Sequence, residues 1–105
     1  MAIYEVPMEV AFADESLDRL ETDAGFNGGF GDQIVKAYRK RLQQIRAAQD
    51  ERTFYALRSL NFEKLKGDRA GQHSMRLNDQ WRLIVELDGK APNKVVRIVE
   101  ITDYH

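Results

Sequence analysis

The spacing of hydrophobic residues predicts helices in the first half of the chain. A short helix begins at Asp14-Glu15-Ser16, whose polar side chains suit a helix start, and it ends at Gly25. A longer helix extends from Asp32 to about Gln49, because apolar residues recur there at helical spacing, at Ile34, Tyr38, Leu42 and Ile45. We expect this stripe to face the core and most of the basic residues between its members to be solvated.

The pattern of apolar and polar residues predicts strands in the second half of the chain. Residues 72–77 and 81–87 alternate between apolar and polar side chains, and residues 95–101 form a β-branched run. Residues 3–10 are interrupted by Glu5 and Pro7, so at most a short edge strand fits there. Helices followed by consecutive strands predict an α+β domain with an antiparallel sheet, one face covered by the helices and the other open to solvent or ligand.

Composition limits the class of protein. A chain of 105 residues, 43% hydrophobic and 31% charged, is the size of one folded domain, which we place at residues 1–105. It contains no cysteine, so disulfides and thiolate metal sites are excluded. No segment approaches the roughly 20 apolar residues of a membrane span, and the start does not read as a secretion signal. These features predict a cytoplasmic protein with no membrane partner.

Charge is distributed unevenly along the chain. Up to Val35 there are eight acidic residues against Arg19 alone, whereas the remainder holds 15 basic residues against 9 acidic ones. This division indicates a basic surface on the later elements that suits a polyanion. Two ordinary solvated faces are the alternative.

Two arginines are expected to meet across a strand pair. If the loop at residues 78–80 joins the first two strands, Leu77 lies opposite Trp81 and Arg76 lies opposite Arg82. Like charges directly opposite one another are unfavourable unless an anion or a carboxylate lies between them. The pairing therefore predicts an anion site, with neutralisation by Glu86 or another carboxylate as an equal alternative.

Three segments carry a resemblance to a known family. They are Leu65-Lys66-Gly67-Asp68-Arg69-Ala70-Gly71, the stretch Ser74-Met75-Arg76-Leu77-Asn78-Asp79-Gln80-Trp81-Arg82, and the ending Val99-Glu100-Ile101-Thr102-Asp103-Tyr104-His105. In this order they resemble HigB-type toxins of the RelE/ParE superfamily, closely over roughly the last 45 residues. The resemblance implies two N-terminal helices packed on a twisted antiparallel sheet, and cleavage of mRNA in the A site of the 70S ribosome. It also implies a HigA-like helix-turn-helix antitoxin as partner.

The same resemblance implies the residues of an active region. By their place in the motifs these are Lys66, Arg82, Asp103, Tyr104 and His105. Some members carry a histidine three residues before the lysine, where this chain has Glu63, which could act as a base or be a surface glutamate.

These residue types suit metal-free RNA cleavage, in which the 2'-hydroxyl attacks the neighbouring phosphate. His105 can serve as acid or base near neutral pH, and an adjacent α-carboxylate would favour the imidazolium and an acid role. A frayed chain end is the alternative for His105. Arg82, Arg69 and Lys66 supply positive charge for the phosphate, and we count Arg76 and Lys64 as further RNA contacts.

Other residues have alternative readings. Tyr104 could stack on a base or pack the last strand, and Asp103 is expected to support other groups rather than to contact phosphate. His73 alternates with Met75 and Leu77 and is expected to be a packed strand residue. The two histidines have no metal-ligand spacing, so we expect no metal and no cofactor. A ParE-like gyrase poison and a non-catalytic RNA-binding module are the competing functions.

Overall fold

The computed structural model describes residues 8–90 and 93–103. Tyr104, His105 and most of the predicted strand at residues 3–10 lie outside the described residues. The helical elements in chain order are α1 (Glu15–Thr22), α2 (Asp32–Ala47), α3 (Arg52–Ala56), and the 3-10 turns η1 (Arg58–Leu60) and η2 (Gly67–Arg69). The strands are β1 (Glu9–Phe12), β2 (Glu63–Lys64), β3 (Gln72–Arg76), β4 (Trp81–Asp88) and β5 (Val95–Asp103).

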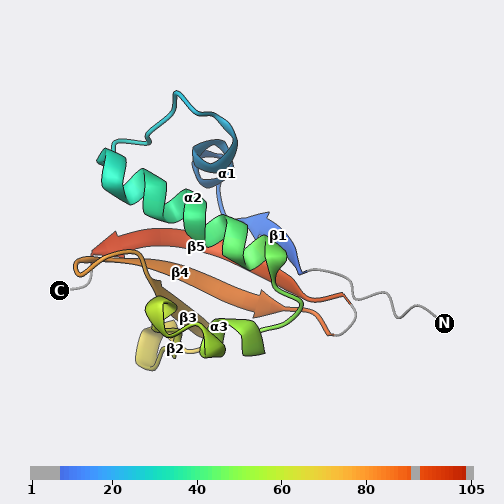
Figure 1. The fold of residues 1–105 in the computed structure, drawn as a ribbon. Coiled ribbons are helices and arrows are strands. Elements are labelled where there is room, and N and C mark those ends of the chain that lie inside the picture. The colour runs from blue at the N-terminus through green and yellow to red at the C-terminus, as the bar shows by residue number, and fades with distance from the viewer. Residues whose placement is uncertain (1–7, 91–92, 104–105) are drawn as a thin grey trace.

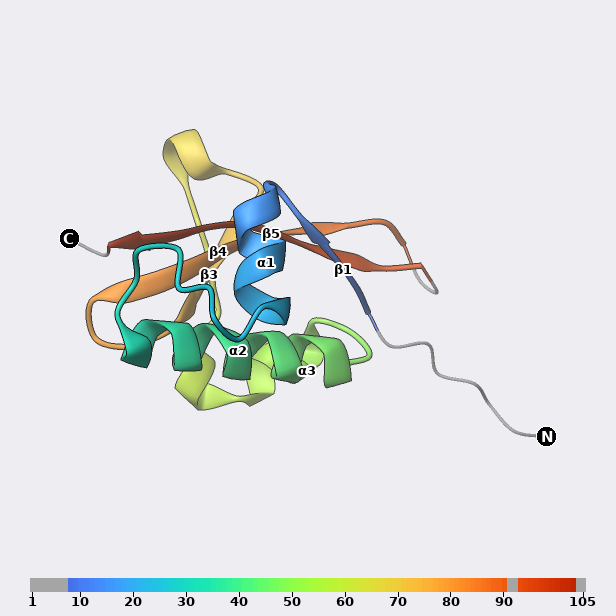
Figure 2. The same cartoon turned by 90° about the horizontal axis from the view of Figure 1, so that it is seen from above.

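The strands form one sheet in the order β1-β5-β4-β3-β2. All neighbouring pairs are antiparallel except β1 and β5, which run parallel. Helices α1 and α2 lie over one face of this twisted sheet, and η2 projects from the opposite side (Figure 1 and Figure 2). The predicted α+β arrangement of two N-terminal helices on a mainly antiparallel sheet is confirmed. The edge strand β1 includes residues 9 and 10 of the segment in which a short edge strand was predicted.

The core lies between the helices and the sheet, as the hydrophobic spacing predicts. Helix α1 begins where the Asp14 carboxylate accepts a hydrogen bond from the Leu17 amide at 3.1 Å. The Tyr38 hydroxyl of α2 is fully buried and donates to the Leu17 carbonyl at 2.7 Å, which joins the two helices. We call the helix-covered side of the sheet the helix face; its fully buried strand residues are Met75, Leu83, Val85, Val96 and Ile98.

The arginines of α2 differ from the expectation that they are solvated. Arg39 donates to the carbonyl oxygen of Leu20 in the last turn of α1 and to those of Asp23 and Phe26 beyond its end. Arg46 forms two 2.7 Å hydrogen bonds with the Glu21 carboxylate. Arg41 is only 8% exposed and donates to the Arg76 carbonyl at 2.8 Å. Burial and the nearby Arg76 charge lower the pKa of Arg41. These three side chains connect α2 to other elements.

The opposite side of the sheet, which we call the open face, is polar. Its side chains are Gln72, Ser74, Arg76, Arg82, Ile84, Glu86, Arg97, Glu100 and Thr102. In β5 the alternation of faces is interrupted, because Val85 pairs with Ile98 while the preceding Ile84 pairs with Glu100. This β-bulge turns Ile101 toward the core and Glu100 toward the open face.

Among the described residues, no helix has the length and apolar character that crossing a membrane would require.

Candidate active site

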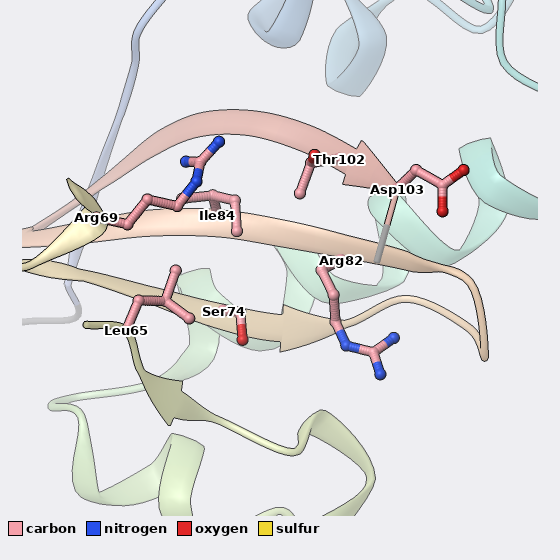
Figure 3. Close-up of a pocket in the computed structure, with 7 residues that line it drawn as sticks. All are labelled: Leu65, Arg69, Ser74, Arg82, Ile84, Thr102 and Asp103. Atoms are coloured by element: carbon pink, nitrogen blue, oxygen red, sulfur yellow. The ribbon is translucent and has the colours of Figure 1, made fainter. Parts of the chain in front are cut away.

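An open hollow of about 460 Å³ lies on the open face. It is lined by Leu65, Arg69, Ser74, Arg82, Ile84, Thr102 and Asp103 (Figure 3). These residues come from β3, β4, β5 and the segment that precedes β3. The apolar side chains of Leu65 and Ile84 line the hollow together with Arg69 and Arg82, whose guanidinium groups point away from each other on either side of Ile84 (Figure 3). The hollow therefore combines an apolar surface with positively charged side chains.

Arg82 is the most buried charged group of the hollow. Only 8% of the residue is exposed, and its guanidinium donates to the carbonyl oxygens of Asn78 at 2.7 Å and Trp81 at 3.2 Å. The Asn78 side chain in turn accepts hydrogen bonds from the Gln80 and Trp81 amides at 2.9 and 2.7 Å. The turn between β3 and β4 is therefore held by its own asparagine, and it fixes one side of Arg82.

The predicted pairing of Arg76 with Arg82 is confirmed by the strand register. Arg76 forms an ion pair with Asp79 in the turn. Asp79 thus neutralises Arg76, which fits the alternative of a neighbouring carboxylate for that one of the two arginines. Glu86 accepts hydrogen bonds from Arg97 at 2.8 Å and from Gln72 at 3.1 Å, and these hydrogen bonds lower its pKa. Glu86 therefore has partners other than the two arginines.

Arg69 reaches the hollow from η2, on the other side of Ile84 from Arg82 (Figure 3). Its guanidinium forms an ion pair with Glu100 of β5 and donates to the Gln72 side chain at 2.9 Å. The segment carrying Arg69 is joined to β3 by a hydrogen bond of 2.9 Å from the Leu65 amide to the Gln72 carbonyl. The structure therefore brings Arg69 and Arg82 to one site, as the sequence predicted for both.

Asp103 also lines the hollow, near the end of β5. It is exposed, and its carboxylate accepts a hydrogen bond from the Gln80 side chain at 2.9 Å. This contact connects the end of β5 to the β3–β4 turn that holds Arg82. Tyr104 and His105, the next two residues in the sequence, lie outside the described residues, so their predicted roles stay predictions.

The other predicted site residues lie around the hollow rather than in its lining. Lys66 is exposed at the residue before η2. Glu63 and Lys64 form the exposed strand β2, with Glu63 opposite Ser74 and Lys64 opposite His73. Directly opposed residues share a face of a sheet, so Glu63 belongs with the open face and Lys64 with the opposite one. Among the predicted phosphate contacts, the structure thus separates Lys64 from Arg69 and Arg82.

His73 packs as the sequence predicts. Its ring stacks on Phe62 with centroids 4.7 Å apart and planes 5° apart. Burial, and then the Lys64 charge, lower the pKa of His73. Within the described part of the chain, no group of three His, Asp or Glu side chains is arranged so that it could hold a metal ion.

Sequence reasoning did not single out Ser74, Ile84, Thr102 or Glu100. Ser74 and Ile84 alternate with core residues in predicted strands, so the predicted alternation could have placed them on the open face. Thr102 and Glu100 could not be placed in this way, because the β-bulge reverses the alternation in β5.

Solved toxin structures share this fold. A "YoeB/ParE toxin from Agrobacterium tumefaciens" has 19% sequence identity and a TM-score of 0.58, covering 93% of this chain and 100% of that one. A chain of a "YoeB-YefM complex from Staphylococcus aureus" has 20% identity and a TM-score of 0.57, covering 93% of this chain and 97% of its own. These identities are low, so the likeness establishes the RelE-like fold alone. No curated protein sequence matches the chain.

The family follows from the sequence itself. The family model described as "RelE-like toxin of type II toxin-antitoxin system HigB" matches residues 10–105. The chain therefore belongs to the HigB-like toxins. It is a RelE-like toxin of a type II toxin–antitoxin system, as the three sequence motifs predicted.

Proposed function

We propose that this toxin is an endoribonuclease that cleaves mRNA in the ribosomal A site during translation and thereby inhibits protein synthesis. The observation that carries the proposal is the convergence of Arg69 and Arg82 on one hollow whose rim includes Asp103. Two guanidinium groups can bind a phosphate through paired hydrogen bonds. His105 lies two residues further along the sequence, and we assign it the role of the acid that protonates the leaving oxygen.

The proposed reaction is an internal transesterification, in which the phosphate exchanges its ester bond to the 5'-oxygen for one to the 2'-oxygen. The 2'-hydroxyl gives its proton to a base, and its oxygen forms a bond to the adjacent phosphorus. The bond from phosphorus to the 5'-oxygen then breaks, and His105 gives a proton to that oxygen. The products are a 2',3'-cyclic phosphate and a 5'-hydroxyl end. Arg82 and Arg69 stabilise the charge that develops on the phosphorane.

The base that we assign for testing is Glu63. It lies on β2 opposite Ser74, and Ser74 lines the hollow. Lys66, Arg76 and Asp103 support the site around this centre, and Tyr104 stacks on or orients an RNA base. Lys64 is the least supported of the predicted phosphate contacts, because its strand partner is His73.

The ribosome and the antitoxin are the proposed macromolecular partners. An open hollow on a five-stranded sheet provides little surface for placing an RNA strand, so the ribosome would supply proximity and orientation. Ribosome binding would place the toxin in the cytoplasm. A HigA-like helix-turn-helix antitoxin is the proposed inhibitor. Solved YoeB-YefM toxin-antitoxin complexes of the same fold support pairing with an antitoxin, while the HigA-like type is our proposal from the family.

Primer extension on mRNA after brief expression of the toxin tests the proposal. Cuts at the A-site codon of translated transcripts are expected with the wild-type toxin and not with Arg82→Ala or His105→Ala. Glu63→Gln tests the base, and its cleavage is expected to fall while the fold, followed by circular dichroism, is retained. Intact transcripts combined with failing gyrase-dependent supercoiling would favour the ParE-like alternative. RNA binding without cuts would favour the non-catalytic module.

An assay with purified components tests whether cleavage by the toxin requires the ribosome. Programmed 70S ribosomes with mRNA are expected to be cut, whereas the same mRNA without ribosomes is expected to remain intact. Comparable rates on naked mRNA would contradict the ribosome requirement. Co-expression with the HigA-like protein is expected to give a stable complex and to restore growth.

A further inference from the structure

We propose that Glu100 is a positioning residue of this toxin, which holds the Arg69 guanidinium in the orientation that the phosphate requires. The inference rests on the proposed nuclease function, because it assigns a role within the same site. Glu100 does not line the hollow, and it acts through Arg69.

The backbone around Arg69 gives its side chain little support of its own. Turn η2 has only three residues and begins with Gly67, and Gly71 follows two residues after its end; the φ angles of these glycines are 66° and 92°. An arginine side chain has roughly 2 kcal/mol of rotamer entropy to lose when it is fixed. Contacts made by the guanidinium itself must therefore fix its position.

Two side chains of the sheet supply these contacts. Glu100 forms the ion pair with one terminal nitrogen of Arg69, and Gln72 accepts from the other terminal nitrogen at 2.9 Å. The Gln72 amide is oriented by Glu86, which is itself bound to Arg97. A continuous set of hydrogen bonds thus crosses the open face from β5 through β4 and β3 to Arg69.

The β-bulge in β5 makes the Glu100 contact possible. With regular alternation after Ile98, position 100 would face the helices and position 101 would face the open side. The bulge places Glu100 opposite Ile84 on the open face, under the Arg69 side chain. Bulges next to active sites commonly redirect a side chain in this way.

The arrangement leaves Arg69 able to bind a second anion. A guanidinium has five N–H donors, and Glu100 and Gln72 engage one nitrogen each. The remaining donors can face the hollow that Arg69 lines. Glu100 adds negative charge beside the phosphate, which weakens RNA binding, but it fixes the orientation on which the transition state depends.

A double-mutant cycle on programmed ribosomes tests the proposal, with single-turnover cleavage rates measured for Glu100→Ala, Arg69→Ala and the double variant. Glu100→Ala is expected to lower the maximal rate roughly tenfold to a hundredfold without raising the half-saturating toxin concentration. Glu100→Gln keeps a hydrogen-bond acceptor and is expected to recover much of the rate. In the Arg69→Ala background, Glu100→Ala is expected to change the rate less than about twofold.

Each other result overturns the inference. Equal losses in both backgrounds would mean that Glu100 acts independently of Arg69. An unchanged or faster rate in Glu100→Ala would mean that Glu100 only repels RNA. Glu9→Gln, an equal loss of charge on the exposed start of β1, is the matched control and is expected to cleave like the wild type.

A second measurement does not depend on cleavage. In nuclear magnetic resonance spectra, the signal of the terminal Nη–H groups of Arg69, which contact Glu100 and Gln72, is expected to be distinct in the wild type and in Glu100→Gln. In Glu100→Ala it is expected to move to the position of a solvated arginine. An unchanged signal in Glu100→Ala would overturn the inference even if cleavage falls. If the wild-type toxin cuts no translated mRNA but the signal moves as expected, the proposed function fails while the positioning contact stands.

Discussion

The two faces of the sheet use the same strands in opposite ways. On the helix face, β4 contributes Leu83 and Val85, which are fully buried in the core. On the open face the intervening residues are Arg82, Ile84 and Glu86, and they form the hollow or its hydrogen-bonded surroundings. Stability and chemistry are therefore separated by one residue along each strand, so substitutions at neighbouring positions should have different effects.

The largest loss of stability is expected on the helix face. Leu83→Ala removes a fully buried side chain and should lower the free energy of unfolding by roughly 2–5 kcal/mol. Urea denaturation followed by circular dichroism measures this loss. Leu87→Ala, on the same face but only partly buried near the end of β4, is the control and should cost less. Equal costs would remove the distinction between the centre and the edge of this core.

The largest loss of activity is expected one residue earlier, on the open face. Arg82→Lys keeps the positive charge but loses the planar pair of donors, and ribosome-dependent cleavage should fall about 10²–10³-fold. The free energy of unfolding should change by only about 1 kcal/mol, because the lost contacts are hydrogen bonds to the Asn78 and Trp81 carbonyls. If Arg82→Lys greatly lowered the free energy of unfolding but left cleavage per folded molecule unchanged, Arg82 would serve stability rather than chemistry, which would contradict the assignment of chemistry to the open face.

Arg41 joins the two faces, and its removal should have an intermediate effect. It reaches from α2 to the carbonyl of Arg76, whose own side chain is on the open face. Arg41→Ala should lower the free energy of unfolding by about 1–3 kcal/mol, because it removes the guanidinium that donates to this partly buried carbonyl. Chemical denaturation gives the cost, and Lys40→Ala, an exposed neighbour in α2, should be close to neutral. A neutral Arg41→Ala would mean that water replaces the guanidinium.

The start of α1 should contribute less. Asp14→Ala should lower the free energy of unfolding by about 1 kcal/mol at pH 7, whereas Asp14→Asn keeps an acceptor and should cost less. Hydrogen bonds from the Ser16 hydroxyl and the Leu17 amide lower the pKa of Asp14. Its ionised form is thus favoured by folding, and this contribution should be lost as pH falls below about 4. Denaturation curves at pH 7 and pH 3 check this, and a cost for Asp14→Ala that does not shrink at pH 3 would contradict it.

The smallest predicted effect is a pH dependence at the edge of the helix face. Burial lowers the pKa of His73, so the folded protein favours the neutral ring, while the unfolded chain binds a proton near pH 6.5. Stability should therefore fall as pH drops below about 6.5 toward the folded-state pKa. His73→Phe keeps the stacking on Phe62 and should reduce this slope. Denaturation of the wild type and of His73→Phe at pH 7.5 and 5.5 measures how the free energy of unfolding of each protein changes with pH. The same change in both proteins would contradict the prediction.

The sequence predicted those features that depend on local periodicity. Spacing within a short segment was enough to predict helix α2 and the side of the sheet to which His73 belongs. It also predicted the pairing of Arg76 with Arg82. The place of Arg82 in the site was predicted from motif resemblance, and that of Arg69 mainly from its charge.

Other features depend on contacts between distant segments, which spacing does not contain. Arg41 bonds to a carbonyl 35 residues away, and Arg69 pairs with Glu100 31 residues away. The β-bulge reverses the alternation of faces in β5, and no proline or glycine in that strand indicates its position in the sequence. For Lys66 and Glu63, the sequence placed the residues near the site but could not predict that they lie outside the hollow's lining.

The position of β5 in the sheet has a consequence for the order in which the toxin folds. This strand is synthesised after the other described elements, yet it lies between β1 and β4 in the sheet. Pairing β1 with β5 closes a loop of more than eighty residues, a long-range step that forms slowly. Because β5 carries Thr102 and Asp103, the lining of the hollow is incomplete until β5 has paired with its neighbours. The site that carries the proposed chemistry therefore forms only after this long-range pairing step.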